Sequence, residues 1–273
     1  MSIALAERHI TAFMDNPDAP RPDNPIHSTE GGKAYGYKAA LVGGVHVYGW
    51  TLPAILDVLG QDWLHDGWIH LTFRRPTYPG DRMVVRIFPA TDAASSLQMD
   101  NQAGARCIIA TLGRGKASWF EALHVPRFKP GEPQPHTLPS LSMDNAPLEQ
   151  ELRPMSVALS VAEAESYARD KVADPNPIYY GTQALIHPGW LAGRPTRLLH
   201  HSYTYGPAIH VQSHIQHLAP AYAGHPLVVT GYCQEVYERK GHHYLVNDVA
   251  IWSERGDELV RLRLTTIFQV AKR

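Results

Sequence analysis

The sequence predicts an α+β protein built from two copies of one domain. Three observations support this: a repeat at constant offset, helical patterns followed by runs of strands, and a proline-rich stretch between the copies. Ala40–Gly44 aligns with Ala184–Pro188, 144 positions later, and Arg75–Val85 aligns with Ala219–Val229 at the same offset. Two copies of this length indicate a duplicated domain rather than a solenoid, which needs several short units.

A proline-rich stretch separates the two copies. Residues 125–155 contain seven prolines and no apolar periodicity, so we expect an extended linker there. The predicted domains are therefore an N-terminal repeat over residues 1–124 and a C-terminal repeat over residues 156–273.

Helical spacing of apolar residues predicts a first helix over residues 3–14 and its counterpart over residues 162–171, where Ser160 and Glu163 form a capping box. A second helix over residues 45–59 is apolar almost all round, so it should be buried, with a kink at Pro53. With the 144-residue offset of the repeat, the two buried helices are expected at 42–59 and about 187–204.

Long β-branched and aromatic runs after each buried helix predict antiparallel strands. They lie at 68–73, 83–88, 105–112 and 116–120 in the first copy, and at 209–215, 227–237, 243–252 and 259–270 in the second. A sheet that wraps one helix leaves an open edge. Two copies placed edge to edge would pair those edges in one continuous sheet.

Charge and composition exclude several classes of partner. The net charge of −1 gives no long-range field for nucleic acid or an anionic membrane, although Arg74-Arg75 could meet a phosphate at close range. No apolar run reaches membrane-spanning length, and the N-terminal residues are too polar for a signal peptide, so we expect a cytoplasmic protein. The two cysteines are expected to be buried free thiols, and neither a metal nor a cofactor is expected.

Three short motifs recur in order in both copies. The first copy has Asp23-Asn24-Pro25-Ile26-His27, then Leu41-Val42-Gly43-Gly44, then Pro76-Thr77-Tyr78-Pro79-Gly80-Asp81. The second copy has Asp174-Pro175-Asn176-Pro177-Ile178-Tyr179, then Leu185-Ile186-His187-Pro188-Gly189, then Pro220-Ala221-Tyr222-Ala223-Gly224-His225.

These motifs resemble those of the MaoC-like family, which includes the (R)-specific enoyl-CoA hydratases. The resemblance implies a double hot dog fold, in which two tandem antiparallel sheets each wrap a long helix. It also implies a hydratase or dehydratase of the lyase class, acting on an enoyl or 3-hydroxyacyl thioester carried by CoA or acyl carrier protein. It leaves a homodimer open.

The catalytic pair of that family, an Asp five residues before a His, is incomplete in both copies. The first copy has Pro22 at the Asp position and Asp23 one residue later, whereas the second has Asp174 in place but Tyr179 instead of His. The chemistry needs a base for water, an acid for the α-carbon and donors for the enolate oxygen.

If the first copy works, His27 and Asp23 form the pair, positioned with Asn24. Backbone N–H groups at Gly43 and Gly44, where the buried helix begins, would then bind the oxyanion. His46 follows in the same helix and is a candidate substrate contact.

If the second copy works, Asp174 would be the base and Tyr179 the donor, with Asn176 and His187 close by. The unperturbed pKa of tyrosine, about 10, makes it a poor acid here. Tyr179 and Trp190, which replaces His46, would also fill the second cleft, so we favour the first copy.

Histidines cluster in the second copy, where five of the 16 lie between 200 and 217. Strand alternation places His210, Gln212 and His214 on one face, where we expect them to line the substrate cleft. Two further functions remain open. The protein could be a hot dog thioesterase, or a non-hydratase that uses the cleft for another small substrate.

Overall fold

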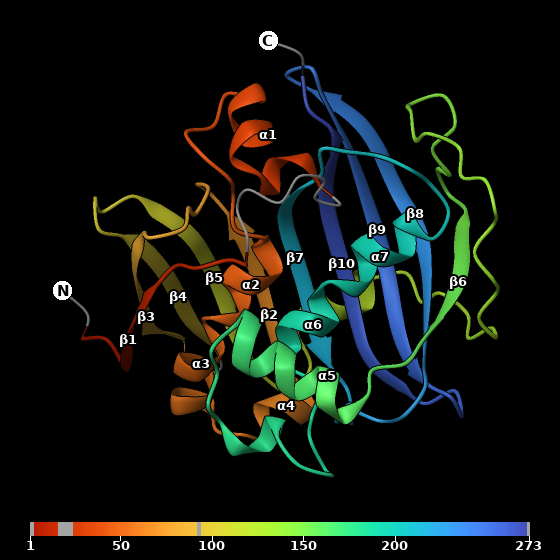
Figure 1. Cartoon of the computed structure of the whole chain (residues 1–273). Coiled ribbons are helices and arrows are strands. Elements are labelled where there is room, and N and C mark those ends of the chain that lie inside the picture. Colours follow the sequence, from red (N-terminus) through yellow and green to blue (C-terminus); the bar gives the residue numbers. More distant parts are fainter. Residues whose placement is uncertain (1–2, 16–23, 92–93, 272–273) are drawn as a thin grey trace.

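The computed structural model describes residues 3–15, 24–91 and 94–271. Within these ranges the strands form one antiparallel sheet of ten strands in the order β1-β3-β4-β5-β2-β7-β10-β9-β8-β6 (Figure 1). The strands are β1 (Ala6–Thr11), β2 (Gly67–Phe73), β3 (Arg82–Thr91), β4 (Ala94–Asn101), β5 (Arg106–Arg114), β6 (Glu151–Val157), β7 (Ile209–His217), β8 (Leu227–Arg239), β9 (His242–Ser253) and β10 (Glu258–Gln269).

Apart from η2, the helices gather on one side of this sheet, as Figure 1 shows. In the first half they are η1 (Pro25–His27), α1 (Thr29–Ala34), α2 (Gly44–Gly49), α3 (Leu52–Leu59), α4 (Trp63–Asp66) and η2 (Phe120–Ala122). In the second half they are α5 (Val161–Ser166), its π-helical continuation η3 (Tyr167–Lys171), η4 (Pro177–Tyr179), α6 (Pro188–Ala192) and α7 (Arg194–His200). None of the described helices is both long and apolar enough to cross a membrane.

The two halves join at β2 and β7, which confirms the predicted edge-to-edge sheet. In this antiparallel pair His70 lies opposite His214, and these two positions are 144 apart in the sequence. Residues related by the repeat therefore face each other at the centre of the join. Their imidazole rings stack with centroids 3.9 Å apart. The strand orders of the two halves mirror each other about this pair.

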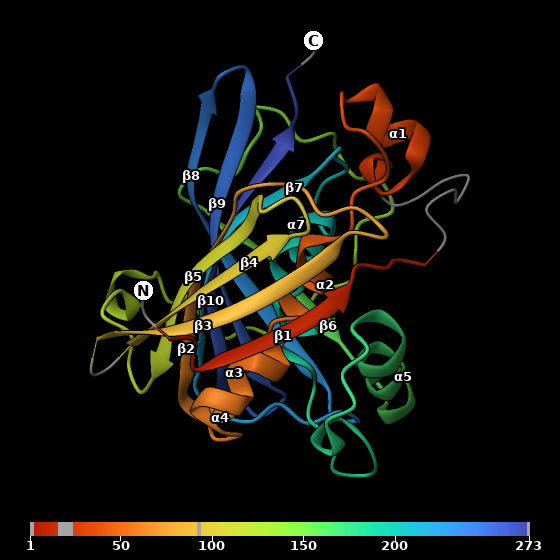
Figure 2. The ribbon, with the colours of Figure 1, turned by 90° about the vertical axis from the view of Figure 1, so that its left-hand side faces the viewer.

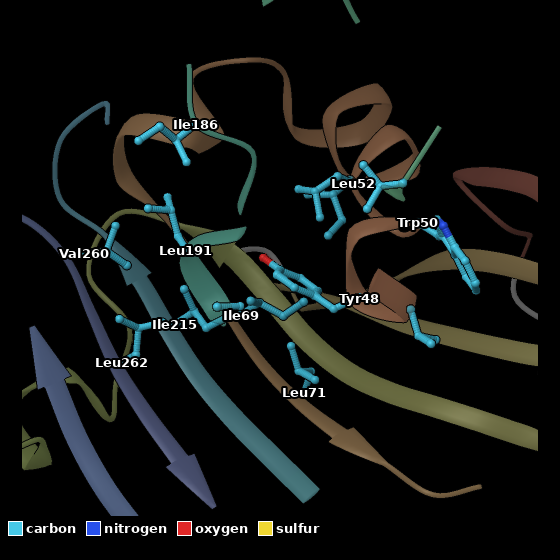
Figure 3. Close-up of a cluster of buried hydrophobic side chains, with 14 of the residues drawn as sticks. Tyr48, Trp50, Leu52, Ile69, Leu71, Ile186, Leu191, Ile215, Val260 and Leu262 are labelled. Atoms are coloured by element: carbon cyan, nitrogen blue, oxygen red, sulfur yellow. The ribbon is translucent and has the colours of Figure 1, made fainter. Parts of the chain in front are cut away.

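One hydrophobic core runs through both halves. Tyr48 of α2 and Leu191 of α6 point toward the same stretch of sheet, where Ile69 and Ile215 lie on the two joined strands (Figure 3). Each of these four side chains is at most 2% exposed. Because apolar burial favours folding at about 25 cal/mol per Å², this shared core binds the halves into one unit.

The helix expected over residues 3–14 is wrong, because this segment contains the edge strand β1 (Figure 2). Backbone pairing with β3 sets its register, with Glu7 opposite Arg86, and the two side chains form an ion pair at 2.6 Å. Ala6 and Ile10 pack on the core. Residues four apart share one face in a strand as well as in a helix, so their spacing could not separate the two.

The strand expected over 116–120 is also wrong. Gly115 adopts a φ of +74° after β5, a conformation that turns the chain away from the sheet. The Ala117 N–H then donates to a side chain, Gln216 Oε1, at 3.0 Å rather than to a neighbouring strand. At the end of the predicted linker, the chain from Glu151 onward belongs to β6, which pairs with β8.

The two other helix predictions are confirmed. The segment 45–59 is helical as α2 and α3, which are separated at Trp50 and Thr51 just before Pro53. Ser160 and Glu163 form the expected capping box at the start of α5, and η3 continues the helix to Lys171.

Candidate active site

A cavity of about 810 Å³ lies between the two halves. It is bordered by η1, the start of α2 and the end of β2 from the first half, and by η3, α6, α7 and β7 from the second. Close packing of α2 against α6 brings these borders together, because a Cβ atom at Gly189 would lie only 2.9 Å from the carbonyl oxygen of Val45. These two positions are again 144 apart.

His27 enters this cavity from the end of η1. Ile26, which is 2% exposed, anchors the short helix in the core. The His27 Nδ1 atom lies 2.7 Å from the carbonyl oxygen of Leu41. Since a carbonyl only accepts, Nδ1 carries the hydrogen in the neutral ring and Nε2 is left as a proton acceptor. A methyl group at Gly43 would lie 3.9 Å from this Nε2 atom.

The start of α2 lies beside His27. Gly43 is the N-cap residue and no side chain caps this helix. Gly44 fits closely against the two joined strands, because a Cβ atom there would lie 3.1 Å from the Cβ of His210 in β7 and 3.2 Å from Cζ of Phe73 in β2. Both glycines border the cavity, so backbone N–H groups at the start of α2 can approach a bound group.

His46 borders the cavity one helical turn further along. A Cβ atom at Gly43 would lie 3.7 Å from His46 Nδ1, so His46 and His27 flank the same glycine. Burial lowers the pKa of His46 to about 4, and the neighbouring His27 and His187 contribute in the same direction. His46 is therefore neutral at physiological pH and can act as a hydrogen-bond partner rather than as a cation.

Asn24 joins the two halves. Its Nδ2 donates to the carbonyl oxygen of Ala208 at 2.6 Å, and its Oδ1 accepts from the Ala208 N–H at 3.3 Å. This amide borders the cavity and fixes the chain immediately before η1, which positions His27. Asp23, the predicted partner of His27, lies outside the described residues.

In the second half the predicted site residues are buried in the core. Asp174 is 2% exposed and His187 is 1% exposed. The N–H of Gly189 donates to His187 Nδ1 at 3.1 Å, so Nε2 carries the hydrogen of the neutral ring. His187 Nε2 lies 3.4 Å from Asp174 Oδ2, but the two atoms form no hydrogen bond. The other oxygen of Asp174 accepts from the Asn176 N–H at 3.0 Å.

Tyr179 completes this buried cluster. It is 0% exposed, and its ring centroid lies 4.6 Å from that of His187. Burial is the main cause that raises the pKa of Tyr179 well above its usual value. Asn176 caps η4 by accepting from the Ile178 N–H at 3.2 Å. None of Asp174, Asn176, Tyr179 and His187 borders the large cavity, whereas Trp190 does.

The expected row of His210, Gln212 and His214 is split between the two faces of the sheet. A β-bulge interrupts β7, because Thr265 pairs with Gln212 and Thr266 pairs with His210. The extra residue, Val211, reverses the alternation on its N-terminal side. The prediction that all three share the cleft is therefore wrong.

His210 and His214 consequently have different surroundings. His210 borders the cavity, and its Nε2 lies 2.6 Å from Ser213 Oγ. Burial lowers the pKa of His210 to about 3. His214 stacks on His70 and contacts the edge of Trp119 on the opposite face.

The structure adds cavity residues that motif analysis missed. Tyr167 of η3 and Arg194 of α7 both border the cavity. The guanidinium of Arg194 stacks on the ring of Trp190 at 3.6 Å, a contact between residues four apart. The spacing of four residues could have predicted this contact from the sequence, but it does not show that the two side chains border a cavity. Within the described ranges, no group of three or more His, Cys, Asp and Glu side chains could hold a metal ion.

Known proteins show what this architecture resembles. No family model and no curated protein sequence matches the chain. Among solved structures, a MaoC domain protein from Chloroflexus aurantiacus J-10-fl has a TM-score of 0.61 at 11% identity, covering 88% of this chain and 86% of that one. A MaoC-like dehydratase has a TM-score of 0.56 at 14% identity, covering 89% of each chain.

A third similar structure is the double hot dog protein Rv0216 of Mycobacterium tuberculosis. Its TM-score is 0.55 at 14% identity, and the match covers 86% of this chain and 84% of that protein. The predicted fold is confirmed by these matches together with the ten-stranded sheet. The chain has an α+β double hot dog fold, similar to that of MaoC-like dehydratases.

Proposed function

We propose that the protein is a hydratase or dehydratase that acts on an enoyl or 3-hydroxyacyl thioester. The observation that carries this proposal is the position of His27, whose Nδ1 is fixed on the Leu41 carbonyl at 2.7 Å and whose ring borders an 810 Å³ cavity beside Gly43. An imidazole whose Nδ1 hydrogen is held by a carbonyl has Nε2 as its basic nitrogen, which can take a proton from water and return it.

The oxyanion site in this proposal is the start of α2. Addition of water to an enoyl thioester places negative charge on the thioester oxygen, and backbone N–H groups held at a helix start can stabilise that charge. Gly43 and Gly44 leave room for the carbonyl, and no side chain caps the N–H groups. In the second half, His187 occupies the corresponding place and accepts from the Gly189 N–H.

A carboxylate would share the proton transfer with His27. Asp23 remains the proposed partner because it precedes Asn24, whose side chain is hydrogen-bonded to Ala208 of the second half. Among the described residues that border the cavity, Asp15 is the one carboxylate, and it is ion-paired with Lys171. Comparing Asp23→Asn with Asp15→Asn therefore distinguishes the two candidates, and we expect the Asp23 variant to lose more activity.

Turnover of crotonyl-CoA, followed by loss of enoyl absorbance, tests the proposal. We expect His27→Ala to lower the rate by about 10²–10⁴-fold, the range typical of general acid–base groups. His225→Ala is the matched control, because His225 is exposed and does not border the cavity. An active enzyme whose rate is indifferent to His27→Ala would contradict the assignment.

The same reaction mixture, monitored for free thiol, tests the thioesterase alternative. Thiol release without loss of the enoyl group would identify thioester cleavage. No change in either signal across short and long acyl chains would favour a non-hydratase that uses the cavity for another small substrate.

A further inference from the structure

The cavity wall carries a positive charge that has no counter-ion among the described residues. Arg194 borders the cavity from the first turn of α7 and is only partly exposed. Its Nε donates to the carbonyl oxygen of Trp190 at 3.2 Å, and its guanidinium lies over the Trp190 ring. Within the described residues no carboxylate pairs with Arg194, and Asp15, the acid on the cavity wall, is paired with Lys171.

An unpaired guanidinium in such a place is costly. Burial and the neighbouring Arg197 lower the pKa of Arg194 to about 10, so the side chain still carries its charge at neutral pH. Taking a cation out of water is unfavourable unless an anion or strong acceptors compensate. The stack on Trp190 fixes the orientation of the guanidinium but leaves its terminal N–H groups without a protein acceptor among the described residues.

A second polar group without a partner lies beside it. The Tyr167 hydroxyl is buried and forms no hydrogen bond among the described residues. Tyr167 borders the cavity, interacts electrostatically with Arg194, and has its ring 5.7 Å from that of His46. This hydroxyl has almost no accessible surface and lies against Gly189. The terminal N–H groups of Arg194, which lack a protein acceptor among the described residues, are therefore the donors that fit an anionic oxygen group on a ligand.

The position of Arg194 relative to His27 indicates which part of the ligand Arg194 would bind. His27 and His46 flank Gly43, and the ring of His46 lies beside that of Tyr167. Tyr167 in turn neighbours Arg194, so only a few side chains separate Arg194 from His27. In CoA the phosphates are separated from the thioester by the whole pantetheine arm. The exposed Arg74 and Arg75 on another part of the wall suit those phosphates better.

We propose that Arg194 binds a carboxylate at the far end of the acyl group. The substrate class would then be acyl thioesters of dicarboxylic acids. This inference rests on the proposed function for the identity of the thioester, and it adds that the acyl chain has a second, charged end.

Equilibrium binding of two saturated, matched ligands to the full-length protein tests the inference. Glutaryl-CoA and pentanoyl-CoA have the same chain length and differ in the terminal carboxylate. We expect glutaryl-CoA to bind at least about tenfold more tightly, as for a charge-assisted hydrogen-bonded pair. Arg194→Met should abolish that preference, so that the two ligands bind with equal affinity, whereas Arg194→Lys should retain part of it. Arg255→Met, at an exposed turn, is the control.

The other possible outcomes would contradict either this inference or the proposed function. Equal binding of the two ligands to the wild-type protein overturns the inference without any variant. If Arg194→Met weakens both CoA esters equally but not the corresponding pantetheine esters, Arg194 binds a carrier phosphate and the inference is wrong. Hydration of pent-2-enoyl-CoA without a glutaryl preference would sink the inference alone. A glutaryl preference without hydration of glutaconyl-CoA would sink the proposed function alone.

Discussion

Replacing His217 by Phe should make the stability of this protein less sensitive to acid. His217 is 2% exposed, its ring meets Trp63 edge-on at 4.9 Å, and its Nε2 has no hydrogen-bond partner among the described residues. Burial lowers the pKa of His217 to about 4 in the folded protein, against about 6.5 when unfolded. A ring of similar shape without a titrating nitrogen removes this difference and keeps the contact with Trp63.

The sign follows from the lowered pKa. Between pH 6.5 and about 4 the unfolded chain binds a proton at His217 that the folded protein excludes. Stability is therefore full above pH 6.5 and is lost as the pH falls toward the folded pKa. One such proton changes the free energy of unfolding by about 1.4 kcal/mol per pH unit, or about 3 kcal/mol across the window.

Urea unfolding at several pH values between 7.5 and 4.5 measures this slope. We expect the slope of the His217→Phe variant near pH 5 to be smaller than that of the wild type by about 1.4 kcal/mol per pH unit. The exposed His225→Phe is the control and should keep the wild-type slope. Equal slopes for wild type and His217→Phe, or an NMR titration of His217 in the native protein near pH 6.5, would refute the reasoning.

Two more predictions concern the second half. Titration with a non-hydrolysable acyl-CoA analogue should give one site per chain, because Asp174, Tyr179 and His187 are at most 2% exposed; two equivalent sites would contradict this. Asp174→Ala should lower the free energy of unfolding by about 2–3 kcal/mol, since it removes the acceptor of the Asn176 N–H and the carboxylate 3.4 Å from His187, while turnover per folded molecule stays unchanged. A large loss of turnover in well-folded Asp174→Ala would place the working site in the second half.

The architecture was predictable because its signals are local and repeated. The buried helix at 45–59 and the strands after it have periods that distinguish helix from strand, and the repeat supplies a second copy of each. The N-terminal segment failed because Ala6 and Ile10 are four residues apart, a spacing common to both. This segment forms a strand because it pairs with the edge of β3, and such long-range pairing is not visible in a local sequence pattern.

The candidate site was harder to predict because it depends on tertiary details. The bulge at Val211 moves His210 to the cavity and leaves His214 on the other face, and a bulge carries no reliable signal in the sequence. Arg194 and Tyr167 come from helices of the second half, whereas His27 comes from the first. Motif matching within one copy finds His27 but cannot bring residues from two copies together.

The two halves differ at the start of their central helices, and only that of the first half borders the cavity with its N-cap residue. Gly43 and His187 are equivalent by the repeat, and each is the N-cap residue of its central helix. In the second half the imidazole of His187 accepts a helix N–H and points its other nitrogen toward Asp174, so the helix start is closed. In the first half a glycine leaves the helix start uncapped and accessible from the cavity.

The second half also contributes residues to the cavity, although its own helix start is closed. Closing its own helix start lets α6 pack against α2, where Gly189 meets Val45 at a close approach that larger side chains would prevent. The same packing carries Trp190 and Arg194 into the wall of the first-half cavity. The second half therefore contributes the far end of the proposed acyl site, while the first contributes the residues beside the reacting carbon.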